Sequence, residues 1–200
     1  MRLDYLKIGS AKDSPTHQFK NLKDVCIDFN EHESITVVIG WNGTGKSNVL
    51  EALAIIFRDL IQKDRIPAFA YELKYEIGSG INKKYVTIQA DPDLENDRFV
   101  FSYLPFQAIL EPLDKEQSCI NLAELKQSDL FESDHKPYID PKEPSIDLPK
   151  PISVSFAKFT ADNSEFLPRF VFSYYSGLST RMQDIFTPYI EQYDKKLRRS

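Results

Sequence analysis

Cysteine and histidine are both scarce in this sequence. Cys26 and Cys119 are its two cysteines, and they lack the C-x-x-C spacing of many metal and redox sites. Two isolated thiols argue against a structural disulfide or a zinc site, and the simple inference is a reducing cytoplasm. The histidines, His17, His32 and His135, are scattered without the spacing of a metal site or of a nucleophile–base pair. We therefore expect surface or loop positions for all three.

Long apolar runs are missing as well. No run approaches the ~20 residues that a membrane-spanning helix needs. The first residues, Met1 to Tyr5, contain no apolar signal region, so we expect a cytoplasmic protein without a membrane partner. The net charge of −5 argues against a surface coated in basic residues for nucleic acid. A local basic groove for nucleic acid stays compatible with that charge.

One short motif dominates what is present. Residues 40–47 read Gly-Trp-Asn-Gly-Thr-Gly-Lys-Ser and fit G-x-x-x-x-G-K-[ST], the phosphate-binding loop of nucleoside triphosphatases. A short β-branched apolar run precedes this phosphate loop at residues 35–39, and an apolar, helix-like run follows it at residues 48–57. Strand, glycine loop and helix therefore stand in the order that phosphate binding requires. This context disfavours the alternative, a glycine turn that only opens an ordinary helix.

Each position of the phosphate loop has a physical role. Gly43 and Gly45 permit positive φ angles and a close approach of the backbone to a ligand. The curled backbone amides and the N-terminus of the following helix attract phosphate oxygens. We expect Lys46 to act catalytically through its charge on the β- and γ-phosphates of ATP, and the Ser47 hydroxyl to ligate Mg²⁺. The expected phosphate-binding set is Asn42, Gly43, Thr44, Gly45, Lys46, Ser47 and Asn48.

Period-two alternation predicts several strands around the phosphate loop. They are expected near residues 3–8, 25–29 and 35–39, followed by a hairpin of residues 71–77 and 85–88 and a strand over residues 98–103. The helix after the loop should end before Pro67. The predicted fold class is α/β: a P-loop NTPase with a mixed parallel sheet around the phosphate-loop helix and an antiparallel β subdomain.

The chain divides into three predicted segments. Residues 1–104 carry the phosphate loop and the antiparallel hairpin. Residues 105–151 are rich in proline and acidic residues, which predicts an irregular insertion with one short helix near residues 122–131. A surface excursion is favoured there over a partner-binding element. Residues 152–200 should return to the core with strands at 152–156 and 170–175 and a helix with Met182, Ile185, Phe186 and Tyr189 on one face.

The segment from Phe19 to Leu53 resembles the N-terminal head of the SMC/RecF/OLD class of ABC-type (AAA) ATPases. Residues 19–24, Phe-Lys-Asn-Leu-Lys-Asp, are similar to the F-[KR]-x-[FL] segment of that class. Residues 42–53, Asn-Gly-Thr-Gly-Lys-Ser-Asn-Val-Leu-Glu-Ala-Leu, match its N-G-[AST]-G-K-[ST]-N-[IVL]-L-E-A-[IL]. The Tyr-Tyr-Ser-Gly-Leu-Ser of residues 174–179 is similar to ATPases associated with bacterial restriction and anti-phage defence loci.

The resemblance implies binding of ATP and Mg²⁺, with ATPase activity and self-association of the heads. It also implies that Lys20 and Asn21 lie near the bound phosphates, although a solvated turn is an equally good interpretation of these two residues. Trp41 departs from the small, polar or proline residue that is common in the class. We expect its ring either to pack against the loop or to flank the nucleotide.

Two motifs of a hydrolysing head are missing. A Walker B strand would end in Asp-Glu, which complete the magnesium shell and position water, but no such tract follows Lys46. Asp28 precedes the loop in a strand that should pair elsewhere. A signature loop like L-S-G-G-Q is absent, and residues 175–179 are better interpreted as a strand-to-helix turn. Near the Q-loop position, Arg181 is a better candidate for a polar role than Gln183.

We therefore expect the N-terminal part of a longer ATPase, or a piece completed by another chain, with hydrolysis dependent on residues beyond it. The leading hypothesis is an ATP-binding head that oligomerises on ATP and drives conformational change in a larger complex. That complex would serve DNA repair, with nucleic acid as a partner, or phage defence, with a nuclease or toxin effector. The alternative is a nucleotide-gated scaffold that holds an effector with little hydrolysis.

Overall fold

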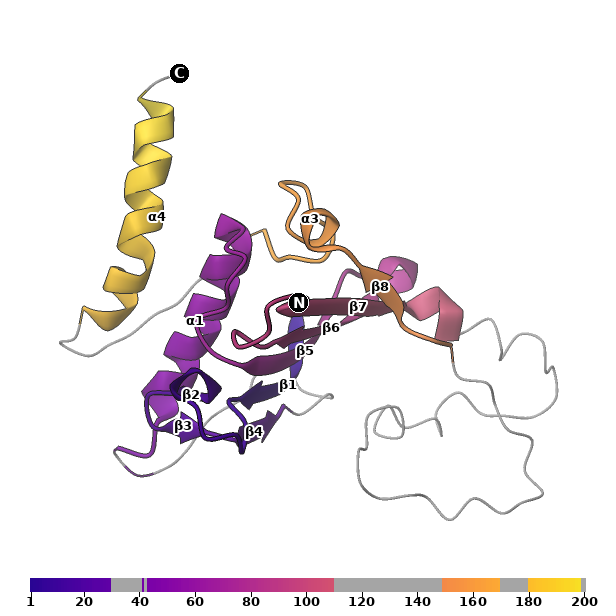
Figure 1. The fold of residues 1–200 in the computed structure, drawn as a ribbon. Coiled ribbons are helices and arrows are strands. Elements are labelled where there is room, and N and C mark those ends of the chain that lie inside the picture. Colours follow the sequence, from indigo (N-terminus) through magenta and orange to yellow (C-terminus); the bar gives the residue numbers. More distant parts are fainter. Residues whose placement is uncertain (30–40, 42, 110–148, 170–179, 199–200) are drawn as a thin grey trace, which may run out of the picture.

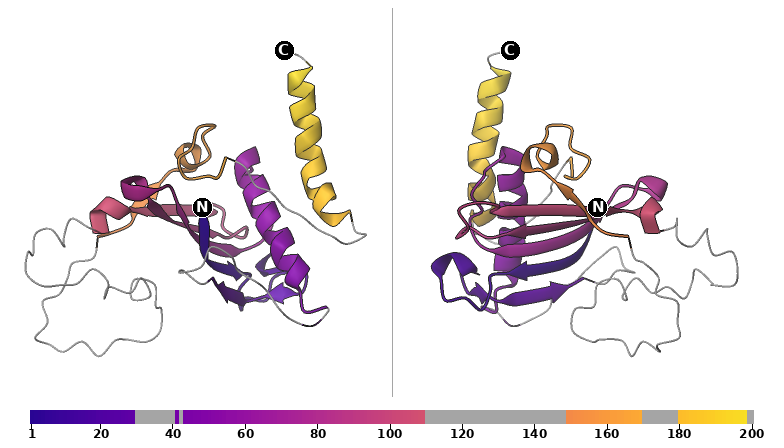
Figure 2. Two further views of the ribbon diagram at one scale, coloured as in Figure 1. Left: turned by 180° about the vertical axis from the view of Figure 1, so that it is seen from behind. Right: turned by 45° about the vertical axis from the view of Figure 1, so that its right-hand side comes forward.

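The centre of the molecule is a twisted sheet with one long helix against it. The computed structural model describes residues 1–29, 41, 43–109, 149–169 and 180–198. Helix α1 (Lys46–Gln62) covers one face of the sheet, and a small hairpin lies beside the first turn of this helix (Figure 1). Figure 2 shows from two further sides that the strands and α1 form separate layers. The apolar core lies between these layers.

The main sheet has six strands in the order β4-β1-β5-β6-β7-β8. Every strand pairing in the described part of the chain is antiparallel. The strands are β1 (Arg2–Ile8), β4 (Val25–Asp28), β5 (Tyr71–Ile77), β6 (Lys84–Ala90), β7 (Phe99–Pro105) and β8 (Ile152–Val154). A second, two-stranded sheet is the small hairpin of β2 (Gln18–Phe19) and β3 (Leu22–Lys23). The 3-10 turns η1 (Pro15–His17) and η2 (Gly80–Asn82) precede β2 and β6.

Alternating side chains explain why β5 forms a central strand. Tyr71, Leu73 and Tyr75 are buried, while the charged residues between them are only half-buried. Successive side chains of a strand point to opposite faces, so this alternation places one apolar face on the core. The Tyr75 hydroxyl donates a hydrogen bond of 2.7 Å to the carbonyl of Phe166, which satisfies the only polar atom of that buried side chain. The expected hairpin over residues 71–88 is confirmed, with Tyr71 opposite Ala90.

Helix α1 supplies the opposite side of the core. Val49, Ala52, Ile56 and Leu60 recur at helical spacing and are buried, which is the stripe that an amphipathic helix presents to a sheet. The helix ends at Gln62, ahead of Pro67 as expected. Its C-cap residue, Lys63, has a positive φ of 63° and donates its backbone N–H to the Leu60 carbonyl, which terminates the helix. Among the described residues, no helix is long and apolar enough to cross a membrane.

The later segments return to the same sheet. Strand β8 pairs with β7, so residues 152–154 extend the sheet formed by the first hundred residues. The strand expected over residues 152–156 is shorter, because Ser155 caps the helix α3 (Phe156–Phe159) by accepting a hydrogen bond from the Lys158 amide. Phe159 stacks on Phe101 at a centroid distance of 4.0 Å. Helix α4 (Arg181–Leu197) contacts α1, and Ile185 on it is buried.

The parallel nucleotide-binding sheet expected from the sequence is not seen among the described residues. Two strands expected at residues 35–39 and 170–175 and the helix expected at residues 122–131 fall outside those residues. The antiparallel sheet has more strands than expected, because the strands near residues 3–8 and 25–28 belong to the same sheet as the β5–β6 hairpin. Residues 106–109, expected to be irregular, are helical.

Candidate functional site

The candidate site is the point where the phosphate loop enters helix α1. Gly43 and Gly45 have φ angles of 87° and 98°, in the left-handed region that favours glycine. Gly45 is the N-cap residue of α1 and has no side chain with which to cap the first backbone amides. The helix dipole places a partial positive charge at this end. The local sequence thus forms a helix start suited to an anion rather than to a capping side chain.

The Trp41 carbonyl organises the loop from inside. It accepts a hydrogen bond of 2.9 Å from the Thr44 hydroxyl and one of 2.6 Å from the Lys46 ammonium. Lys46 therefore folds back over its own loop. Trp41 is 87% exposed as a residue, so the expected packing against the loop is not seen, and flanking of a nucleotide stays a prediction.

The β2–β3 hairpin holds the loop from outside. The Asn21 side-chain amide donates a hydrogen bond of 3.4 Å to the Gly43 carbonyl, and its oxygen accepts one of 2.6 Å from Asn48. A Cβ atom on Gly45 would lie 2.8 Å from Leu22 Cδ2 and 3.1 Å from the Asn21 side chain. Gly45 therefore serves two purposes, since it provides the backbone turn and leaves room for the hairpin.

An ion pair ties the same hairpin to the second turn of the helix. Lys20 Nζ lies 2.5 Å from Glu51 Oε1, and the Glu51 side chain is only 11% exposed. Sequence reasoning assigned no role to Glu51. The available signal was a charged residue at a position that helical spacing places toward the core. Its partner could not be identified from spacing, because 31 positions separate the two residues.

The structure brings most of the predicted site residues together. Gly43 to Asn48 lie at the start of α1, and the residues predicted near the phosphates, Lys20 and Asn21, contact that same region. Lys20 is directed to Glu51, and Asn21 to the loop backbone and Asn48. Their binding of ATP, and the Mg²⁺ role of Ser47, stay predictions. Asn42 and residues 174–179 lie outside the described residues, and Gln183 is exposed on α4.

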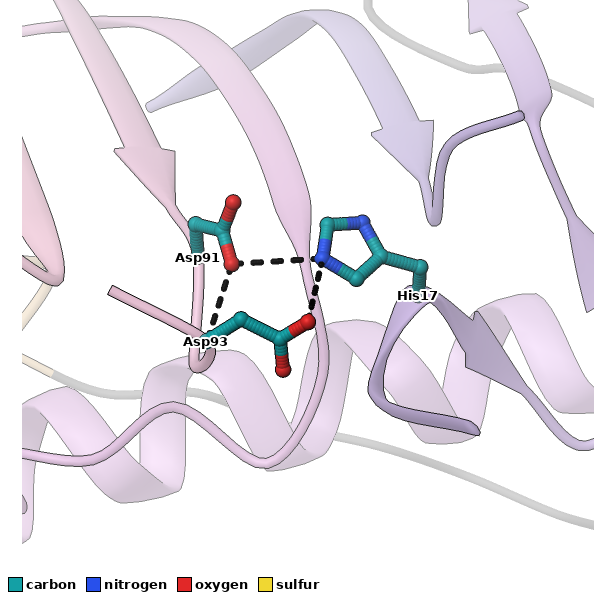
Figure 3. A group of neighbouring side chains, drawn as sticks. All are labelled: His17, Asp91 and Asp93. Carbon is teal, nitrogen blue, oxygen red and sulfur yellow. Dashed lines mark hydrogen bonds and ion pairs between the residues drawn. The ribbon is translucent and has the colours of Figure 1, made fainter. Parts of the chain in front are cut away.

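A second polar cluster lies at the other end of the hairpin. His17, expected at a surface or loop position, lies in the η1 turn, but its side chain is buried, with the residue only 4% exposed. Its ring faces Asp91 and Asp93, which follow β6 (Figure 3). A hydrogen bond from the Thr16 hydroxyl and the Lys12 ammonium lower the pKa of Asp93 to about 2. Sequence spacing missed this cluster because His17 lies more than seventy positions before the two aspartates.

Comparison with known proteins identifies the family. A family model described as an AAA ATPase domain matches residues 17–163, which include the hairpin, the phosphate loop, α1 and five of the six strands of the main sheet in whole or in part. No curated protein and no solved structure matches the chain. The matched span covers well over half of the sequence and contains the geometry described above. The chain therefore belongs to the AAA ATPase domain family.

Proposed function

We propose that this chain binds ATP with Mg²⁺ at the phosphate loop and acts as the nucleotide-binding head of an ATPase. The observation that carries the proposal is the space over Gly43. Gly43 has a left-handed backbone, and apart from its chain neighbours no atom of the described residues lies within 4 Å of the position that a Cβ would occupy there. At Gly43 the backbone of the loop is therefore not covered by side chains of the described residues. It lies near Lys46 and the N-terminus of α1. Such a concave run of amides fits phosphate oxygens.

The loop residues divide the work of binding. Lys46 would exchange the Trp41 carbonyl for oxygens of the β- and γ-phosphates, where its charge offsets the charge that develops during transfer. The Ser47 hydroxyl fits the oxygen preference of Mg²⁺. Asn21 would keep the loop in shape through its bonds to Gly43 and Asn48, so that little reorganisation is needed when phosphate arrives.

The similarity of residues 19–53 to SMC/RecF/OLD heads supports a finer proposal. In it, the chain self-associates on ATP and drives conformational change in a DNA-related or anti-phage defence complex, with a nuclease or toxin as the possible effector class. Hydrolysis would use a water-orienting carboxylate supplied from outside residues 1–200, because no Asp-Glu tract follows Lys46 in a Walker B context. The same missing tract favours a second candidate, a nucleotide-gated scaffold with turnover close to background.

Lys46→Ala tests the binding site. We expect ATP affinity to fall about 10- to 100-fold, since a charge-assisted contact with phosphate is lost, while the melting temperature changes little. Calorimetric titration with ATP and Mg²⁺ and a thermal melt are the measurements. Lys63→Ala is the matched control, because Lys63 follows the same helix at its far end and pairs with the exposed Asp162. Unchanged ATP affinity in Lys46→Ala would contradict the assignment.

Phosphate release by the purified chain separates the two candidates for hydrolysis. Turnover that depends on Lys46 and appears only when a complementing segment or partner is added supports the ATPase head. Tight ATP binding with background turnover under all these conditions supports the scaffold. Lys46-dependent turnover by the chain alone would contradict the proposal that the water-orienting carboxylate comes from outside residues 1–200. Asp28 would then be the first carboxylate to test.

A further inference from the structure

His17 is buried with one ring nitrogen directed at two carboxylates. Its side chain is 5% exposed, and Nε2 lies 3.3 Å from Asp91 Oδ1 and 3.3 Å from Asp93 Oδ2 (Figure 3). Nε2 is nevertheless a buried atom without a hydrogen-bond partner in the described part of the protein. Burial of an unsatisfied polar atom is costly, so this nitrogen calls for a further ligand or a proton.

The other ring nitrogen fixes the orientation of the imidazole. His17 Nδ1 lies 2.6 Å from Ser10 Oγ, which also accepts a hydrogen bond of 3.2 Å from the Lys12 amide. When Nδ1–H donates to Ser10, the lone pair of Nε2 points toward the two carboxylates. That arrangement is repulsive unless a cation lies between them. Metal-binding histidines commonly have their second nitrogen held in this way.

Both carboxylates are held in place by their own partners. Asp91 Oδ1 accepts a hydrogen bond of 2.9 Å from the Asp93 amide. Asp93 Oδ1 accepts one of 2.6 Å from the Thr16 hydroxyl, and Asp93 Oδ2 accepts one of 2.9 Å from the Lys12 ammonium. Lys12 supplies one positive charge against two carboxylates, so these three side chains keep one unbalanced negative charge beside the imidazole.

We propose that His17 Nε2 and the carboxylates of Asp91 and Asp93 form a binding site for a divalent transition-metal ion, with Zn²⁺ as the best fit. Ligands about 2.1 Å from one ion are separated by about 3.0 to 3.4 Å at angles between right and tetrahedral. The two distances of 3.3 Å from Nε2 fall in that interval. The imidazole favours a transition metal over Mg²⁺ or Ca²⁺, which prefer all-oxygen sites. Water would complete the coordination.

The position of the site gives the ion a structural task. His17 is the last residue of η1 and directly precedes β2, while Asp91 and Asp93 follow β6 of the main sheet. An ion shared by them would fasten the base of the β2–β3 hairpin to the sheet. The competing interpretation is a His17 ring that carries a proton on Nε2, directs it at both carboxylates and needs no metal. The two interpretations differ in whether Zn²⁺ is bound.

Zinc titration of the purified protein tests the proposal. After treatment with EDTA and its removal, we expect a single site that competes with a chromophoric chelator and raises the melting temperature. Asp91→Asn and His17→Gln should each weaken Zn²⁺ binding at least about tenfold. Asp91→Asn keeps an oxygen that can accept from the Asp93 amide, so it decides the question if His17→Gln fails to fold.

Asp13→Asn is the control, because Asp13 is a fully exposed acid in the same loop that pairs with Lys23 instead. It should bind Zn²⁺ as the parent does, and so should Lys46→Ala, whose defect belongs to the ATP site. Absence of Zn²⁺ binding by the parent would overturn the proposal and favour a metal-free His17 with its proton on Nε2. Equal Zn²⁺ affinity in the parent, Asp91→Asn and folded His17→Gln would also overturn it.

Discussion

The two ends of the β2–β3 hairpin differ in how their polar groups are held. At the base, the His17 ring is almost fully buried and lies among Ser10, Asp91 and Asp93. At the tip, Asn21 is exposed and contacts the phosphate loop through a hydrogen bond of 3.4 Å to the Gly43 carbonyl. The base is thus fixed on the sheet, whereas the tip meets a loop that has open space above it.

The base of the β2–β3 hairpin therefore anchors it to the sheet, whereas its tip contacts the phosphate loop. The backbone at the base is closed by the Ser10 amide, which donates to the His17 carbonyl, and by the Ala70 amide, which donates to the Thr16 carbonyl. A Cβ on Gly9 would lie 2.3 Å from the His17 carbonyl oxygen, so even this small residue is part of the closure. Because the base is held by these backbone hydrogen bonds, we expect a change at the phosphate loop to alter the contacts of the hairpin tip and to leave the sheet in place.

Substitution of Gly45, one of the two loop glycines, should cause the largest loss of stability, because it disturbs the contact between the hairpin tip and the phosphate loop. Gly45→Ala combines a left-handed φ of 98° with a Cβ only 2.8 Å from Leu22, so we expect a loss of about 2–3 kcal/mol in the free energy of unfolding. Gly43→Ala has a similar φ but no neighbour to displace, and should lose only about 1 kcal/mol. Urea unfolding measures both, and equal losses would show that the hairpin does not press on Gly45.

Removal of the Lys20 charge should have an intermediate effect. Lys20→Met leaves the Glu51 carboxylate, which is 11% exposed, without its ion-pair partner, and we expect a loss of about 1–2 kcal/mol, discounted because Lys20 itself is 41% exposed. Adding Glu51→Gln should restore much of that loss, since no charge is then left uncompensated. A double-mutant cycle by chemical denaturation measures the coupling. Additive losses would mean that the pair does not anchor the tip.

The smallest effect should come from acid at the base of the hairpin. The pKa of Asp93 is lowered from 3.8 to about 2, first by the Thr16 hydroxyl and then by Lys12. The ionised form is therefore favoured on folding, so this stabilisation is present above about pH 4 and is lost as the pH falls through about 2. In buffer with EDTA, the difference in stability between parent and Asp93→Asn should shrink from pH 5 to pH 2.5. A constant difference would contradict the lowered pKa.

Local patterns predicted the elements, but not their partners. The alternation of Tyr71, Leu73 and Tyr75 and the stripe on α1 were sufficient to place a hairpin and a helix. The period-two pattern of one strand does not show which distant strand it pairs with. For this reason the strands near residues 3–8 and 25–28 were not assigned to the sheet of β5 and β6. The parallel sheet remains a prediction, because two of the expected strands, at residues 35–39 and 170–175, lie outside the described residues. The strand expected at residues 152–156 pairs antiparallel with β7 instead.

The candidate site shows the same division. The glycine and lysine positions of the phosphate loop follow from a motif whose residues are adjacent in sequence. The roles of Glu51 and His17 depend on contacts across 31 and more than seventy positions, which only the folded chain brings together. Spacing along the sequence predicted a surface or loop position for His17. The residue does lie in the η1 turn, but its burial depends on contacts that spacing does not reveal.

Trp41 gives the phosphate loop an intrinsic fluorophore that is exposed to solvent. It is the single tryptophan among the 200 residues and is 87% exposed, while its carbonyl accepts a hydrogen bond from the Lys46 ammonium. Indole emission shifts with the polarity around the ring, and no second indole contributes background. A lysine that leaves the Trp41 carbonyl for phosphate would alter the surroundings of this fluorophore. We therefore expect Trp41 emission to change when ATP is added if the proposed binding site is correct, and a fluorescence titration would measure that change without an added label.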